Sequence, residues 1–399
     1  MTEAPVMPPV APQPPEGPTT LSGRIQARWN TGGAISAIAT TLLAFFVGGL
    51  VVAATGHNPL STYRAIFNGT GLAWLIPGVG NRGDEASNLQ QTLLVATPLM
   101  LTGLALAFAF RCGMFNIGGQ GQYLAGQVVS VLVATSWIGL NGPVHIILAL
   151  VLAALAGAFW AGIAGFLKAT TGAHEVISTI MLNWIAIWIA DYFFGLGGPF
   201  TGVAFNPSSA SIEANTHLPV FWGNPLLQGL HIGFFIAIGM LFVYWLLLNR
   251  TTLGFEVRAV GFNPEAARYA GISVKRSYFL ALAFSGLFAG LAGAIDILGW
   301  QFSLATPQIH ASQIGFIGIA VALLGRNSAI GVFFAALLFG ALSVGTSTRQ
   351  LDPSIFDPQL ATNLTLIIQG LVVLFVGADV LVLAMWRSPK RLLARIRAK

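Results

Sequence analysis

The stretch Asn249–Arg276, NRTTLGFEVRAVGFNPEAARYAGISVKR, carries seven charged residues between two long apolar runs. The chain as a whole has 8% charged and 55% hydrophobic residues and a mean hydropathy of +0.76. Soluble domains carry about 25% charged residues. Successive apolar runs of about 20 residues are typical of helices that cross a bilayer. We therefore predict an all-α polytopic membrane protein in which Asn249–Arg276 is a water-exposed loop.

The apolar runs predict about ten transmembrane or re-entrant helices. The run Ile314–Leu324 is too short to span a bilayer unaided, and Gly119–Trp137 begins among glutamines, so either segment could re-enter the membrane instead. The predicted helices are Gly33–Ala54, Gln91–Phe110, Gly119–Trp137, Val144–Leu167, Val176–Leu196, Leu230–Leu248, Tyr278–Leu298, Ile314–Leu324, Ala329–Thr346 and Ala361–Met385.

The distribution of positive charge predicts the orientation. With both termini in the cytoplasm, sixteen of the nineteen Lys and Arg residues fall on the cytoplasmic side, together with Asn249–Arg276. The outside receives only Arg64, Arg82 and Arg349, in agreement with the positive-inside rule. This placement at helix ends accounts for the net charge of +6 without a nucleic-acid partner.

Composition also divides the chain into regions. Residues 1–30 are rich in proline and predict a disordered cytoplasmic tail. Residues 31–388 form the predicted transmembrane domain, and residues 389–399 form a basic cytoplasmic tail that could contact anionic membrane lipids. In the external segments, the short apolar stretches Tyr63–Phe67 and Val220–Trp222 are expected to form interfacial helices where an external partner would bind.

The sequence shows no constellation typical of an enzyme. It has no phosphate-binding glycine loop followed by lysine, no nucleophile elbow and no closely spaced set of His and Cys ligands. The single cysteine, Cys112, excludes an intramolecular disulfide. We expect no catalytic residue, no metal site and no cofactor on this chain.

Within the charged loop, local signals predict a short helix lying across the membrane face. After the helix that ends near Leu248, Thr251–Val260 is expected to continue as a cytoplasmic helical stub until Gly261 breaks it. Asn263 is a suitable N-cap, Pro264 suits the first helical position, and Gly271 suits the C-terminal end. The predicted helix covers residues 264–270, although an ordinary solvated loop is the alternative interpretation.

Several motifs resemble one family of transporters. Glu265-Ala266-Ala267 followed by Gly271 is similar to the EAA-x-x-x-G loop of ABC-importer permeases. The stretches Gly113–Gln122 (GMFNIGGQGQ), Gly172–Asn183 (GAHEVISTIMLN) and Gly315–Gly325 (GFIGIAVALLG) resemble the nucleoside and simple-sugar branch of the branched-chain-type permease family.

The resemblance implies a permease subunit of an ATP-driven importer for nucleosides or related ribose or simple-sugar compounds, in a bacterial cytoplasmic (inner) membrane. Its implied partners are a cytoplasmic ATP-binding subunit that holds ATP and Mg²⁺, a second permease (a related chain or a second copy), and an external substrate-binding protein. The expected ATPase-coupling residues are Asn263, Pro264, Glu265, Ala266, Ala267, Arg268, Tyr269 and Gly271.

Polar and aromatic residues inside the predicted helices indicate a substrate path. Such side chains are unfavourable in lipid unless they face the bundle interior or a cavity, and amides can both donate to and accept from sugars and bases. Hydrogen bonding between helices is the competing interpretation for each of them. The candidate path residues are Phe115, Asn116, Gln120, Gln122, Asn183, Trp184, Asp296, Trp300, Gln301 and Gln313.

The alternative function is an ion-coupled secondary transporter of small polar solutes. That mechanism needs a buried titratable or ion-binding site and no ATPase. It would leave the charged stretch Asn249–Arg276 without a role, so the sequence favours the importer.

Overall fold

The computed structural model describes residues 34–76, 78, 82–136, 139–203, 205–224, 229–346 and 358–377. This part of the chain is mostly helical, and seven of its helices are long and apolar enough to cross a membrane. The prediction of a polytopic helical membrane protein is thereby confirmed, whereas the figure of ten spans stays a prediction. The two predicted tails, residues 1–30 and 389–399, lie outside the described residues.

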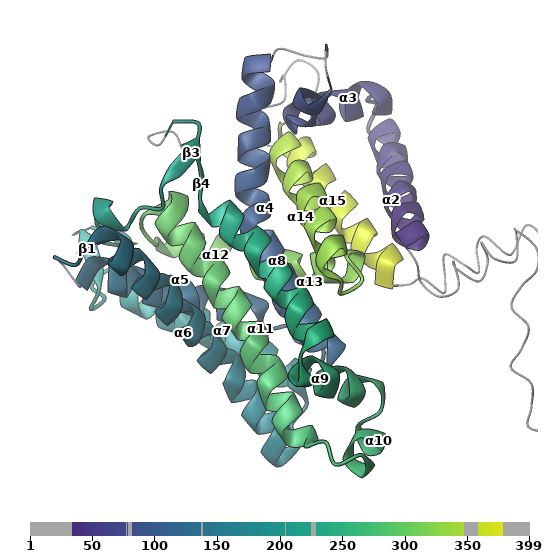
Figure 1. The fold of residues 1–399 in the computed structure, drawn as a ribbon. Helices are drawn as coiled ribbons and strands as arrows, with labels where there is room; N and C mark the ends of the chain where they lie inside the picture. Colours follow the sequence, from purple (N-terminus) through teal and green to yellow (C-terminus); the bar gives the residue numbers. More distant parts are fainter. Residues whose placement is uncertain are drawn as a thin grey trace, which may run out of the picture.

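The helices follow one another along the chain as in Figure 1. The long helices are α2 (Ala34–Ala54), α4 (Arg82–Arg111), α5 (Gly119–Ser136), α6 (Gly142–Thr171), α7 (Glu175–Phe194), α8 (Gly233–Arg250), α11 (Val274–Asp296), α14 (Ala329–Gly345) and α15 (Pro358–Gly377). The short ones are α3 (Pro59–Gly69), α9 (Thr252–Phe262), α10 (Pro264–Tyr269), α12 (Thr306–Ala311), α13 (Ile314–Leu324), the 3-10 turns Leu72–Leu75 and Ala214–Thr216, and the π-helical segment Ile297–Gln301.

Figure 1 places α9 and α10 at one end of the helix bundle, which we call the α10 end. The short strands lie at the opposite end, the β end, and pair as two antiparallel hairpins. These strands are β1 (Thr201–Val203), β2 (Asn206–Ser209), β3 (Val220–Trp222) and β4 (Leu230–His231).

The β end corrects one expectation from the sequence. Tyr63–Phe67 lies in helix α3, as expected, but Val220–Trp222 is strand β3 and not an interfacial helix. The stretch alternates in exposure and contains a β-branched and two aromatic residues, which suits a strand when β4 is available for pairing.

The short predicted helix Ile314–Leu324 is present as α13, and α12 precedes it across a break at Ser312–Gln313. Together they form one of the seven candidate spans, Thr306–Leu324. Helix α13 alone is too short to span a bilayer, and α12 adds the length that it lacks.

Helix α11 lies against three other helices, α4, α5 and α6, and packs on two of them through backbone. A Cβ atom on Gly290 would lie 2.4 Å from the carbonyl oxygen of Ala153 in α6. A Cβ atom on Gly126 of α5 would lie 2.2 Å from the carbonyl oxygen of Gly290. Such spacing admits only glycine, and it explains why small residues are concentrated in these helices.

At the β end, the chain between β1 and β4 lies over the segment that follows α11. Leu218 N–H donates to the Leu298 carbonyl at 2.8 Å, and Ser209 N–H donates to the Leu304 carbonyl at 2.9 Å. The Ser209 hydroxyl in turn accepts from Leu304 N–H at 3.0 Å. The β end and the segment after α11 are therefore joined by hydrogen bonds.

His231 in β4 packs against Gly299 of the π-helical segment. Its ring is buried, Nδ1 accepts from Gly233 N–H at 3.1 Å, and a Cβ atom on Gly299 would lie 2.1 Å from Nε2. Burial lowers the pKa of His231 from 6.5 to about 4. The neutral imidazole is therefore the form that fits the folded protein.

We expect Gly290→Ala to lower the thermal stability of the purified protein by about 1–3 kcal/mol, because the added methyl group displaces α6 from α11. Gly239→Ala in α8 is the matched control, since no atom lies within 4 Å of its Cβ position. Thermal unfolding in detergent measures both variants. Equal stability of the two would contradict the packing described above.

We also expect stability to fall as the pH decreases from about 6.5 to about 4. The unfolded imidazole binds a proton in this range whereas folded His231 does not, so the contribution, up to about 3 kcal/mol, is complete above pH 6.5. Thermal unfolding across this pH range measures the effect. His231→Asn, which keeps an acceptor without titrating, should show a flatter profile, and an unchanged slope would refute the assignment.

Candidate functional site

Helix α10 is present where the sequence predicted a short transverse helix. The Asn263 side chain accepts from Ala266 N–H at 3.0 Å, and Pro264 occupies the first helical position. The helix ends at Tyr269, one residue earlier than predicted. Gly271 follows with a φ of +81°, which a side chain would strain.

The outer surface of α10 is available to a partner. Tyr269 is 93% exposed, and Phe262, directly before the N-cap, is 90% exposed. Arg268 donates to Glu265 at 3.2 Å, and both side chains are about two-thirds exposed. Ala267 is buried and directs the opposite side of the helix toward the bundle. An exposed pair of aromatic rings beside a charged pair is typical of a protein-binding surface.

Helix α9 differs from the sequence expectation at Gly261, which does not break the helix. Helix α9 continues to Phe262, and Gly261 lies against the turn between α4 and α5. A Cβ atom on Gly261 would lie 2.2 Å from the carbonyl oxygen of Arg111. Glycine is required there for the contact between elements and not for a helix stop.

The contact at Arg111 extends to a further turn. The Arg111 Nε donates to the Asn327 carbonyl at 2.9 Å, and the Tyr244 hydroxyl of α8 donates to the same oxygen at 2.9 Å. Arg326 and Asn327 both have a φ of +52°, so this turn between α13 and α14 has a strained conformation held from outside. Helices α9, α4, α8 and α13 thus meet at the α10 end.

Four of the predicted path residues form buried hydrogen bonds between elements. Asn116 Nδ2 donates to the Ser285 hydroxyl of α11 at 2.8 Å and to Gln122 Oε1 at 3.2 Å. Asn183 of α7 accepts from Gly121 N–H at 2.8 Å. Gln120 Oε1 accepts from Gly315 N–H at 2.9 Å, while its Nε2 has no partner among the described residues.

A second polar cluster lies toward the β end, where α11 passes into the π-helical segment. Asp296 is buried, accepts from the Tyr123 hydroxyl, and accepts from Trp300 Nε1 at 2.9 Å. Gln127 Nε2 donates to the Tyr123 hydroxyl at 2.9 Å and to Gln301 Oε1 at 3.1 Å. The cluster joins α5 to the end of α11, and a π-helical segment at such a position is common at functional sites.

The remaining predicted residues face outward. Phe115 is 42% exposed and stacks on Phe110, with ring centroids 4.9 Å apart. Trp184 of α7 and Gln313 before α13 are both exposed. The predicted set is therefore divided between two buried clusters and an outer surface, and Ser285 and Tyr123 are members that the sequence analysis missed. A single hydroxyl within an apolar run gave no signal for Ser285, and Tyr123 lies among the more evident polar side chains Gln120, Gln122 and Gln127.

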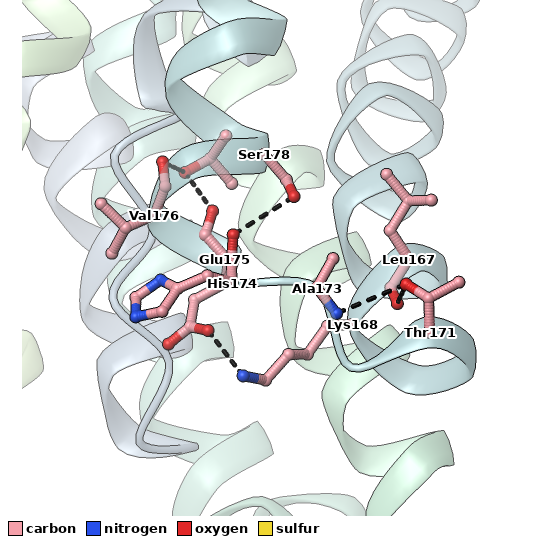
Figure 2. Close-up of polar contacts among 9 residues, drawn as sticks. Leu167, Lys168, Thr171, Ala173, His174, Glu175, Val176 and Ser178 are labelled. Carbon is pink, nitrogen blue, oxygen red and sulfur yellow. Dashed lines mark hydrogen bonds and ion pairs between the residues drawn. The ribbon is translucent and has the colours of Figure 1, made fainter.

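The motif Gly172–Asn183 begins at the turn between α6 and α7, drawn in Figure 2. Lys168 of α6 reaches across the turn to Glu175 at 2.8 Å, and both side chains are mostly buried. Lys168 also lies 5.9 Å from the centre of the Tyr278 ring of α11. The ion pair ties the start of α7 to α6 beside the first turns of α11.

Comparison with known proteins identifies similar chains. The family model described as branched-chain amino acid transport system, permease component, matches residues 88–377. The guanosine ABC transporter permease protein NupP of Bacillus subtilis is 36% identical over 340 residues, covering 85% of this chain and 91% of its own length.

Two further relatives cover similar shares of the chain. The nucleoside ABC transporter permease protein NupB of Lactococcus lactis is 33% identical over 357 residues, which is 88% of this chain and 93% of NupB. The glucose ABC transporter permease protein TsgB13 of Haloferax volcanii is 35% identical over 346 residues, 85% of each chain. No solved structure matches.

Proposed function

Since this chain belongs to the family of permease components of branched-chain amino acid transport systems, we propose that it forms the membrane path of an ATP-driven importer of nucleosides or related ribose compounds. Two of the relatives described above are named for guanosine or nucleosides and one for glucose. Nucleosides contain both a sugar and a base, so they are the substrate class that these names favour.

In this proposal α10 is the element that docks onto a separate ATP-binding subunit, which would hold ATP and Mg²⁺. The observation that carries this assignment is the α10 surface, where Phe262 and Tyr269 are almost fully exposed on either side of the Glu265–Arg268 pair. Rings left in water are unfavourable unless a partner covers them. The α10 end would accordingly face the cytoplasm, with both termini on that side.

Motion of α10 would reach the rest of the bundle by two contacts. Through Gly261, α9 rests on the backbone of Arg111, which also holds the turn between α13 and α14. Through Ser273, whose hydroxyl accepts from Arg276 N–H, the chain passes directly into α11. Closure of the ATP-binding subunits would thus shift the equilibrium between two arrangements of these helices, as alternating access requires.

The β end would receive an external substrate-binding protein. Its hairpins are joined by hydrogen bonds to the segment that follows α11, so a partner that contacts the hairpins also contacts the far end of that helix. A second permease, either a related chain or a second copy, would complete the path, in a bacterial cytoplasmic membrane. An ion-coupled mechanism is not favoured, because the relatives are ABC transporter permease proteins.

Uptake of radiolabelled guanosine, uridine, ribose and glucose into proteoliposomes that contain the assembled transporter tests the function. We expect uptake of the nucleosides only when ATP and the ATP-binding subunit are present on the α10 side. Equal uptake in vesicles without that subunit would refute the importer.

We expect Tyr269→Ala combined with Phe262→Ala to reduce co-purification of the ATP-binding subunit at least tenfold and to reduce uptake in parallel, because both rings would lie in the interface. Phe205→Ala is the matched control, since Phe205 is 98% exposed in the chain between β1 and β2 at the opposite end. Co-purification is measured on protein extracted from membranes. If Phe205→Ala reduced co-purification of the ATP-binding subunit as much as the double variant does, the docking assignment would be contradicted.

A further inference from the structure

The outward surface of α7 differs from the outward surfaces of α2 and α6. Trp184 and Trp188 lie one turn apart on this surface and are 56% and 60% exposed. Asp191 lies on the next turn, and its Oδ1 is 3.5 Å from Nε2 of His310 in α12. We call Trp184, Trp188, Asp191 and His310 the α7–α12 face, and Gln313 is exposed two residues after the end of α12.

The outward surface of α6 provides a contrast within the same bundle. Its exposed positions from 144 to 166 are all apolar, namely Val144, Ile147, Val151, Leu155, Phe159 and Phe166. Such a stripe suits contact with lipid chains. The exposed stripe of α2 has the same character, at Ile38, Leu42, Phe46 and Leu50.

Lipid does not suit the α7–α12 face. A carboxyl group and an imidazole occur there inside two candidate spans, Glu175–Phe194 and Thr306–Leu324. The side chains of Asp191 and His310 are 26% and 41% exposed, so the bundle does not enclose them. Charged groups at membrane depth are costly unless they face a protein partner or a water-filled space.

The arrangement of these groups indicates what would occupy that space. The His310 ring packs edge-on against the Trp188 ring, with centroids 5.7 Å apart, so the imidazole that contacts Asp191 lies beside an exposed indole. The two tryptophans line a groove of about 510 Å³ together with Ile185, Ile189, Tyr192 and Phe193. Flat apolar rings next to hydrogen-bonding groups match a planar heterocycle that carries hydroxyl groups.

We infer that the α7–α12 face is the wall of the substrate path, on which Trp184 and Trp188 stack with the nucleobase while Asp191 and His310 bind the polar edge of the base and the ribose hydroxyls. This inference rests on the proposed function and assigns its substrate contacts to an outer surface. The amides of Asn116, Gln122 and Asn183, in contrast, position helices, because their hydrogen bonds are made within the bundle.

Cysteine labelling tests the wall directly, because the only native cysteine, Cys112, is buried. In a Cys112→Ala background, Trp184→Cys and Trp188→Cys report on the α7–α12 face. Phe159→Cys, at a position that is 71% exposed on α6, is the control for a lipid-facing surface. Each variant of the assembled transporter is reconstituted in liposomes and exposed on both sides to a water-soluble, sulfonated maleimide.

We expect the two α7 cysteines to react at least tenfold faster than Phe159→Cys, because a thiol reacts as the thiolate in water and not in lipid. Excess guanosine or uridine should slow the α7 reaction, and glucose should not. Reaction rates equal to that of Phe159→Cys would overturn the inference that this face lines the substrate path. Rapid labelling that no nucleoside slows would overturn the assignment of the ligand.

Uptake kinetics separate a binding role from a structural one. Trp188→Ala should raise the KM for nucleoside uptake about tenfold through loss of stacking, with little change in the maximal rate. Trp188→Phe should recover most of the affinity, and Phe159→Ala should leave both parameters unchanged. A fall in the maximal rate at constant KM would overturn the inference. ATP-dependent uptake by the parent protein tests the proposed function separately. Failure of the importer proposal is therefore distinguishable from failure of the substrate contacts inferred here.

Discussion

The structure depends on the backbone contact between α11 and its neighbours α5 and α6. Gly290 lies so close to Ala153 and Gly126 that no side chain fits between the helices. In a bilayer, helices gain little from burying apolar surface against each other, because lipid is equally apolar. Close packing and hydrogen bonds must hold them instead. The glycine contacts provide the close packing, and the buried clusters at Asn116 and Asp296 provide the hydrogen bonds.

Held in this way, α11 extends between the α10 end and the β end of the molecule. Its first turn follows α10, the element that we propose contacts the ATP-binding subunit. Its last turn passes into the π-helical segment, and the chain at the β end is hydrogen-bonded to Leu298 in that segment and to Leu304 just after it. Figure 1 shows this helix extending from α10 toward α12. In the function that we propose, α11 would therefore connect a change at one end of the permease with the other end.

The polar residues within the spans have two different environments. Asn116, Gln122 and Asn183 are buried and use their amides to join elements, as the competing interpretation of the sequence proposed. Trp184 lies instead on an outer surface, beside the contact between α7 and α12, and Gln313 is exposed beyond the end of α12. In a permease that functions with partners, an outer surface of one chain can be an inner surface of the assembly. The polar character of this surface is therefore more informative than its exposure.

The sequence by itself determined the class of protein, most helix positions and the short helix α10, because these depend on local signals. Runs of apolar residues predict spans, and an Asn-Pro pair followed by glycine predicts a short capped helix. The tertiary structure decided which face of each helix points inward. Helices such as α6 and α7 are apolar on nearly all sides, so they carry no periodic signal for an inner face. The same limit explains why Ser285 was missed as a partner of Asn116, and why Gly261 was interpreted as a helix stop. Its requirement for glycine comes from the Arg111 backbone, about 150 residues earlier in the chain, and only the folded arrangement brings the two together.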